Sequence, residues 1–252
     1  MTKYLLSLQY RGTAYCGFQV QKNGISVQEK IQDALEALYG KRLPVKGCSR
    51  TDAGVHALDF RLSFEDESTP ARFGAQALPQ AINAHLPEDI AVWRCQEVPE
   101  KFHVRYDVRS KTYVYFIWNR REPHVFLQGL AWHIPAPLDL APMRLAAGAL
   151  CGRHDFRSFA AKGCAKEDTT RTVFSFDIEE REGLITLRVS ADGFLYNMVR
   201  ILVGTLCEIG AGTRPADSVA QILEQKNRTA AGMTAPPHGL YLEKVRYSDP
   251  QE

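Results

Sequence analysis

One short segment of the chain gathers residue types that can do chemistry. Residues 49–57 read S-R-T-D-A-G-V-H-A, which places a guanidinium (Arg50), a carboxylate (Asp52) and an imidazole (His56) within seven positions. Carboxylates and imidazoles exchange protons, and arginine forms charge-assisted hydrogen bonds with carboxylates and phosphates. Aspartate and glycine also favour turns, so the same residues taken alone are those of an ordinary loop.

Two predicted strands hold this segment between them. Pro44–Gly47 precedes it, and Asp59–Glu65 follows it with Phe60, Leu62 and Phe64 alternating with polar residues. This alternation is typical of a strand with one buried face. The segment is therefore predicted to be a loop that joins two strands.

Other patterns complete the first half of the chain. Lys3–Tyr10 alternates as a strand does, and Ser26-x-x-Glu29 is a capping box that begins a helix ended by Gly40. Pro70 is predicted to open a second helix that carries Phe73, Ala77 and Ile82, and Ile90–Glu97 is predicted to be a strand.

The second half repeats this plan. The expected elements are a strand at Thr112–Trp118, a helix capped by Asp139, a hairpin of Arg171–Glu180 and Leu184–Ala191, an apolar helix from Met198 to Ile209, a short helix after Pro215 and a last strand at Gly239–Tyr247. We predict an α+β fold of two similar halves, residues 1–105 and 106–252, whose antiparallel sheets form a central cleft.

Composition restricts the class of protein. The 252 residues are 45% hydrophobic and 24% charged, which predicts a packed core, and no apolar stretch approaches the length that spans a bilayer. The start of the chain runs directly into a strand pattern without the features of a signal peptide, so we expect a cytoplasmic protein. The six cysteines form no C-x-x-C and the seven histidines no H-E-x-x-H, so we expect free thiols and no metal site.

Charge is distributed unevenly, although the net charge is only +2. Between Lys101 and Glu122, six basic residues and two acidic residues are interleaved with six aromatic ones. Cations that meet phosphates beside rings that stack on bases suit RNA binding. The alternative is a strand with one solvated face.

The whole nine-residue segment closely resembles the motif G-R-T-D-x-G-V-H-A of the TruA family of tRNA pseudouridine synthases. The resemblance extends over nearly the whole chain: Y-x-G…Y-x-G-F-Q at residues 10–19, S-V-Q-E at 26–29, N-A-H-L-P-E-D-I at 83–90, F-H-V-R at 102–105, K-T-Y-V-Y at 111–115, G-x-H-D-F at 152–156 and F-L-x-N-M-V-R at 194–200.

The resemblance implies an isomerase that needs no cofactor, because converting uridine to pseudouridine moves one bond without a redox step. It implies Asp52 as the nucleophile, Arg200 as its partner and Tyr113 as the active-site tyrosine, whose ring would stack on uracil. Arg50 would fill the space that a flipped base leaves, His56 would touch the RNA backbone, and Phe194 and Leu195 would line the pocket. Simple packing remains the alternative for four of these residues: His56, Phe194, Leu195 and Tyr113. For Arg200, the alternative is a surface arginine on a core helix.

The resemblance also implies a substrate and an assembly. Family members modify uridines 38, 39 and 40 of the tRNA anticodon stem-loop and act as homodimers. This chain departs from the family pattern at Ser49, where glycine is usual, at Phe18, where tryptophan is usual, and at Asp59–Ser63, where the family has G-Q-V-x-H.

Three other interpretations stay open at this point. The first is a non-catalytic RNA-binding or tRNA-folding module of the same fold, which would not need Asp52, Tyr113 and Arg200 together. The second is a nucleoside hydrolase with an aspartate nucleophile, which would not need the basic and aromatic cluster. The third is a metalloenzyme built from scattered cysteines and histidines.

Overall fold

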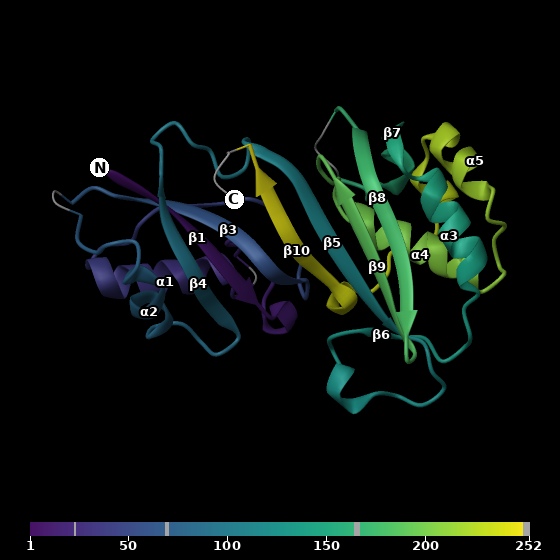
Figure 1. The fold of residues 1–252 in the computed structure, drawn as a ribbon, viewed down its shortest axis with the longest axis horizontal. Helices are drawn as coiled ribbons and strands as arrows, with labels where there is room; N and C mark the ends of the chain where they lie inside the picture. Colours follow the sequence, from purple (N-terminus) through teal and green to yellow (C-terminus); the bar gives the residue numbers. More distant parts are fainter. Residues whose placement is uncertain (23, 69–70, 164–166, 249–252) are drawn as a thin grey trace. The chain divides into compact units, whose positions relative to one another are not determined.

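The computed structural model describes residues 1–22, 24–68, 71–163 and 167–248, and Figure 1 shows the fold. The chain forms two compact units. Unit 1 holds Met1–Arg109 together with the C-terminal segment from Tyr241, and unit 2 is Ser110–Leu240. Each unit combines a sheet with helices, which confirms the α+β class. We predicted contiguous halves, whereas in these units the last strand joins the first part of the chain.

The longest strand in the sheet of unit 1 is β3 (His56–Asp66). The strand order of this sheet is β4 (Ile90–Val98), β1 (Thr2–Tyr10), β3 and β10 (Leu240–Tyr247), with the short β2 (Val45–Gly47) paired to β3. β1 is antiparallel to both of its neighbours, and β10 runs parallel to β3, with Tyr241 opposite His56. The last strand of the chain therefore lies directly beside the strand that follows the Asp52 segment.

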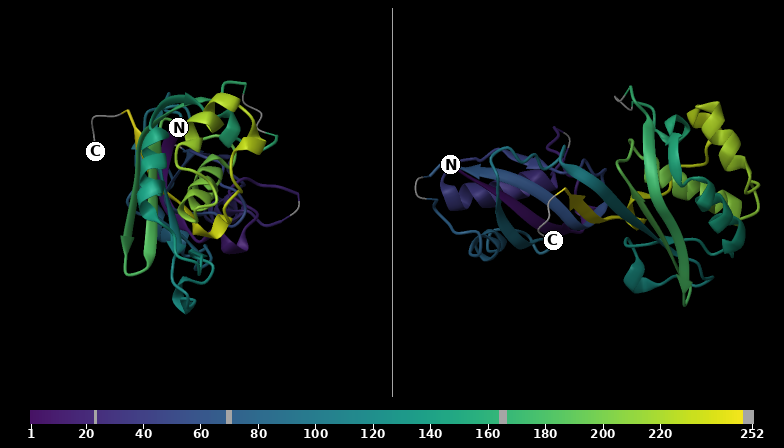
Figure 2. Two further views of the ribbon diagram at one scale, coloured as in Figure 1. Left: turned by 90° about the vertical axis from the view of Figure 1, so that its right-hand side faces the viewer. Right: turned by 45° about the horizontal axis from the view of Figure 1, so that its top comes forward.

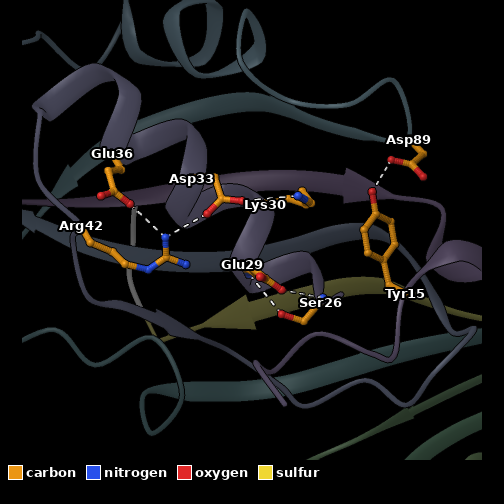
Figure 3. A network of polar contacts seen from close by, with 8 residues as sticks. All are labelled: Tyr15, Ser26, Glu29, Lys30, Asp33, Glu36, Arg42 and Asp89. Carbon is orange, nitrogen blue, oxygen red and sulfur yellow. Dashed lines mark hydrogen bonds and ion pairs between the residues drawn. The ribbon is translucent and has the colours of Figure 1, made fainter. Parts of the chain in front are cut away.

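Helix α1 (Val27–Tyr39) begins and ends where the sequence predicts. The Ser26 hydroxyl accepts a hydrogen bond from the Glu29 amide at 3.1 Å, and the Glu29 carboxylate accepts from the Ser26 amide at 3.4 Å (Figure 3). Gly40 ends the helix at φ 72°, a left-handed conformation that glycine adopts without strain. The Tyr39 ring meets the Phe64 ring edge-on, so α1 covers the face of the sheet that carries Phe64.

The second helix is shorter than predicted. α2 is Leu78–Asn83, and Phe73 and Ala77, which we predicted to be helical, precede it. Pro79 lies in its first turn, where a residue without an amide hydrogen costs no hydrogen bond. The predicted start, Pro70, lies outside the described residues.

The strands of unit 2 pair mostly antiparallel. Their order is β5 (Val108–Trp118), β9 (Leu184–Ala191), β8 (Thr170–Arg181) and β7 (Gly152–Asp155), and β6 (Trp132–His133) pairs parallel to the end of β5. The predicted hairpin of β8 and β9 is confirmed. Its turn residues, Glu182 and Gly183, both have positive φ, as a two-residue type I′ turn requires.

Three helices complete unit 2: α3 (Leu140–Ala149), α4 (Met198–Gly210) and α5 (Ser218–Gln225). Asp139 caps α3 by accepting the Ala141 amide, as predicted. Nearly every residue of α4 is buried, and α3 packs against both α4 and β8. In the right-hand view of Figure 2, α4 and α5 lie on the same side of β8.

The described residues bear on two expectations from composition, which concern the state of the cysteines and membrane-spanning helices. Five cysteines are free thiols, and Cys164 lies outside the described part of the chain. None of the helices in the described ranges has the length and apolar character needed to cross a membrane.

The capping box predicts a measurable share of stability. Ser26→Ala removes the hydroxyl that accepts the Glu29 amide and is expected to lower the free energy of unfolding by about 1 kcal/mol. Lys30→Ala is the matched control, because its ion pair with Asp33 is half-exposed and contributes less than about 0.5 kcal/mol. Urea unfolding followed by circular dichroism measures both. Equal effects of the two changes would contradict the prediction.

Candidate active site

The Asp52 segment is a loop fixed along its backbone. It follows β2 and ends where β3 begins, at His56 rather than at the predicted Asp59. Thr51 is buried, and its hydroxyl lies 2.7 Å from that of Tyr10. The Thr51 carbonyl accepts the Phe18 amide at 3.2 Å. The residue before Asp52 is therefore held by both its side chain and its main chain.

Two glycines let the chain's first turn lie directly against this loop. A Cβ atom on Gly12 would overlap the Val55 carbonyl, and one on Gly17 would lie 2.5 Å from the Thr51 carbonyl oxygen. Gly17 also has φ +110°, which other residues rarely adopt. The Gly54 amide completes the contact by donating to the Tyr15 carbonyl at 3.3 Å. The family motif includes both glycines, but only the close approach of the two backbones explains them.

Asp89 holds the other side of the first turn. The Tyr15 hydroxyl donates to the Asp89 carboxylate at 2.5 Å (Figure 3), and the Arg11 amide donates to the Asp89 carbonyl at 2.9 Å. Burial, followed by the hydrogen bond to Asp89, raises the pKa of Tyr15, so this hydroxyl stays a donor. Sequence reasoning assigned no role to Asp89, and no local pattern pairs it with Tyr15.

Asp52 lies in the reverse turn of this fixed loop. Its carbonyl accepts the Val55 amide at 3.2 Å, and Gly54 supplies the positive φ of +78° that closes the turn. The Asp52 side chain is half-buried, and that of Arg50 is exposed. The loop thus presents a carboxylate on a rigid backbone with a guanidinium two positions away.

His56 is buried in unit 1. Its side chain is 1% exposed, and its Nδ1 accepts the Gly12 amide at 3.1 Å. Its ring stacks on that of Tyr241 with 4.5 Å between centroids, and burial raises the pKa of Tyr241 to about 12. These contacts support the packing alternative for His56, because they tie the first turn and β10 to the start of β3.

The strand that departs from the family pattern carries an ion pair. The carboxylate of Asp59 lies 2.8 Å from the guanidinium of Arg61, and both side chains are largely buried. The Arg61 guanidinium lies 5.7 Å from the centre of the Trp93 ring on β4. Asp59 and Arg61 are two positions apart, so they share one face of β3 and satisfy each other's charge.

Unit 2 brings together Tyr113 and the segment before α4. Tyr113 pairs with Val189 in the middle of β5 and is 6% exposed. Its ring meets the ring of Phe194 edge-on, with 5.0 Å between centroids at 85°. Leu195 is buried, and its carbonyl accepts the Met198 amide at 3.1 Å, at the start of α4. Tyr113 and Phe194 are therefore neighbours, as a shared pocket requires.

Arg200 is anchored rather than extended into solvent. Its Nε donates to the Ala235 carbonyl at 2.7 Å, and its Nη1 donates to the Asn197 side-chain oxygen at 2.8 Å. The Ala235 amide in turn donates to the Arg200 carbonyl at 3.0 Å. Two bonds from one planar group fix the plane of the guanidinium, so the structure does not favour a surface arginine. Asn197 and Ala235, which sequence reasoning missed, are the residues that orient it.

The predicted site residues thus fall into two groups. Arg50, Asp52 and His56 belong to unit 1, and the others belong to unit 2: Tyr113, Phe194, Leu195 and Arg200. Within the described ranges, no three histidine, cysteine or acidic side chains gather as metal ligands would.

Comparison with known proteins identifies the family of this chain. A family model described as tRNA pseudouridine synthase matches residues 7–107 and 146–248. The chain belongs to the tRNA pseudouridine synthase family, whose members are isomerases, and the resemblance to the TruA type is confirmed.

The similar relatives share nearly their full length with this chain. A "tRNA pseudouridine synthase A" of Thermoanaerobacter sp. (strain X514) is 44% identical over 98% of this chain and 100% of the relative. One of Citrifermentans bemidjiense is 43% identical over 99% of both chains, and a "tRNA pseudouridine synthase A 2" of Bacillus anthracis is 38% identical over 98% of this chain and 100% of the relative. A solved structure described as "Crystal Structure of a Cbf5-Nop10-Gar1 Complex" matches 94% of this chain and 57% of that chain at a TM-score of 0.37 and 12% identity, which is a weak likeness.

The tight contact at Gly17 predicts a specific sensitivity. Gly17→Ala is expected to lower the free energy of unfolding by roughly 2–4 kcal/mol and to reduce pseudouridine formation at least about tenfold, because the Thr51 carbonyl must move. Gly40→Ala is the control: it also has positive φ, but its Cβ would meet nothing within 4 Å. It should cost about 1 kcal/mol and leave activity unchanged. Urea unfolding and a tRNA assay measure both, and equal activity losses would refute the prediction.

Proposed function

We propose that this chain isomerises uridine to pseudouridine in the anticodon stem-loop of tRNA, at positions 38, 39 and 40, with Asp52 as the nucleophile and no cofactor. The observation that carries the proposal is the Asp52 turn, whose sequence closely resembles the family motif and whose neighbouring backbone is hydrogen-bonded on both sides. A nucleophile held on a rigid loop needs little reorganisation before it attacks.

The reaction balances without any other reactant. The C1′–N1 glycosidic bond breaks, the base turns, and a C1′–C5 bond forms. C5 loses its hydrogen as a proton, and N1 gains one. A carboxylate is suited to hold one fragment during this turn, as carboxylate nucleophiles do at sugar C1 in glycosidases.

The remaining residues take supporting roles in the proposal. Arg200 is the cation that keeps the Asp52 carboxylate ionised, and its fixed plane suits a charge-assisted bond. The Tyr113 ring stacks on uracil, with its hydroxyl placed to assist removal of the C5 proton, and Phe194 holds that ring from the side. The exposed Arg50 fills the space of the extruded base.

The proposal extends to the assembly and to the mode of recognition. Reaching three adjacent nucleotides with one site requires recognition of tRNA shape rather than base sequence, because A-form RNA offers little sequence information. We propose a homodimer in which two protomers share one tRNA, which accords with a net charge of only +2.

Asp52→Asn is expected to reduce tritium release from tRNA labelled at uridine C5 at least about a thousandfold, while tRNA affinity stays within about threefold. Amide and carboxylate have the same size, so the change removes the nucleophile without opening a cavity. Asp33→Asn is the control, because Asp33 is a half-exposed carboxylate on α1 (Figure 3). Full tritium release by Asp52→Asn would refute the proposed nucleophile. Binding by the native chain without release from any tRNA would favour the RNA-binding alternative.

Target choice has its own test. Replacing uridines 38, 39 and 40 by cytidine is expected to abolish release from a tRNA that keeps all its other labelled uridines. Restoring any one of the three should restore release. Undiminished release from the substituted tRNA would show that this chain modifies other positions.

A further inference from the structure

A turn between β4 and β5 displays an aromatic ring to solvent. Within residues 99–107, the side chain of Tyr106 is 75% exposed. Its ring stacks on the His103 imidazole with 4.2 Å between centroids at 30°, and the Arg105 guanidinium lies 5.9 Å from the centre of the ring. These three neighbouring side chains of one turn form a cluster, which we call the Tyr106 platform (His103, Arg105 and Tyr106).

The turn that carries the platform is closed by its own hydrogen bonds. Nδ1 of His103 accepts the amides of both Arg105 and Tyr106 at 3.2 Å. The Asp107 carboxylate accepts the His103 amide at 2.8 Å, and the Asp107 amide donates to the His103 carbonyl at 3.1 Å. The imidazole therefore positions the backbone of the residue whose ring stacks on it.

Contacts with the first and last strands of unit 1 also hold this turn. Val104 is fully buried, and its carbonyl accepts the Tyr247 hydroxyl at 2.7 Å. The Phe102 ring lies 5.1 Å from the Tyr247 ring, and the Lys3 ammonium donates to the Phe102 carbonyl at 3.1 Å. A ring fixed before its ligand arrives loses little conformational entropy on binding.

We propose that the Tyr106 platform stacks one unpaired nucleobase of the bound tRNA, while Arg105 and the nearby Lys101 and Arg109 neutralise its flanking phosphates. The inference rests on the proposed function only in taking RNA as the ligand. It adds a binding site for a nucleotide that is not the one modified.

Charge and chemistry favour an RNA base over an apolar protein partner. The exposed residues between Pro99 and Arg109 include three basic ones, Lys101, Arg105 and Arg109, whereas apolar docking needs a contiguous apolar patch. Two acidic residues, Glu100 and Asp107, are also exposed in this range, and the Asp107 carboxylate already accepts the His103 amide. A paired A-form helix exposes no base faces, so the ligand is a base in a loop or a bulge.

Tyr106→Leu tests the stacking directly. It keeps an apolar side chain but removes the ring, and it is expected to raise the Kd for tRNA about 5- to 100-fold. Tyr106→Phe and Tyr106→Trp keep a ring and should stay within about twofold of the native chain. Phe126→Leu is the matched control, because it removes an even more exposed ring, at 84%, from unit 2.

Further readouts separate this inference from the proposed function. At saturating tRNA, tritium release by Tyr106→Leu should equal that of the native chain, so that KM rises and kcat does not. Ultraviolet cross-linking to tRNA should attach a nucleotide to the peptide that contains Tyr106. A fully paired RNA duplex should bind Tyr106→Leu and the native chain equally.

Each result decides one of the two proposals. An unchanged Kd for Tyr106→Leu, or equal weakening by Tyr106→Phe, would overturn the stacking platform while leaving the isomerase intact. Equal weakening of tRNA and duplex binding would also overturn it. Weakened tRNA binding by Tyr106→Leu together with no tritium release by the native chain would refute the proposed function and leave the platform standing.

Discussion

The close approach of two backbones is the constraint on which the candidate site of unit 1 depends. The first turn of the chain lies against the Asp52 loop so closely that neither Gly12 nor Gly17 has room for a side chain. Backbone contacts of this kind leave no rotamer to adjust, so they fix the position of a carboxylate more narrowly than side-chain packing does. The buried Tyr10–Thr51 bond and the Tyr15–Asp89 bond then close the loop from either side.

Close main-chain contacts also orient the Arg200 guanidinium in unit 2. A Cβ atom on Gly204 would overlap the Met233 carbonyl, and the Thr205 hydroxyl accepts the Gly232 amide at 2.9 Å, so the segment before β10 is bound tightly to α4. That segment supplies the Ala235 carbonyl that receives Nε of Arg200. The guanidinium is thus positioned by main chain that is itself held on a buried helix.

The Tyr106 turn extends this principle to a surface residue. Its ring is exposed, yet the backbone beneath it is tied to Tyr247 on the last strand and to Lys3 on the first. β10 also carries Tyr241, against which His56 stacks. The last strand therefore supports both the start of β3 and the displayed turn, although it is the segment farthest in sequence from the first turn of the chain.

Local signals in the sequence determined the parts of this protein that depend on neighbouring residues. They predicted the Ser26–Glu29 capping box, the end of α1 at Gly40 and the Glu182-Gly183 hairpin. Each of these features depends only on hydrogen bonds and φ angles of residues within a few positions of one another. The motif around Asp52 identified the family. Only the tertiary structure decided that α2 starts at Leu78, that His56 is buried, that Asp89 holds Tyr15, and that Asn197 and Ala235 orient Arg200. Most of these contacts join residues far apart in the chain. They form, and stabilise the fold, only after the strands have paired, so no local sequence pattern predicts them.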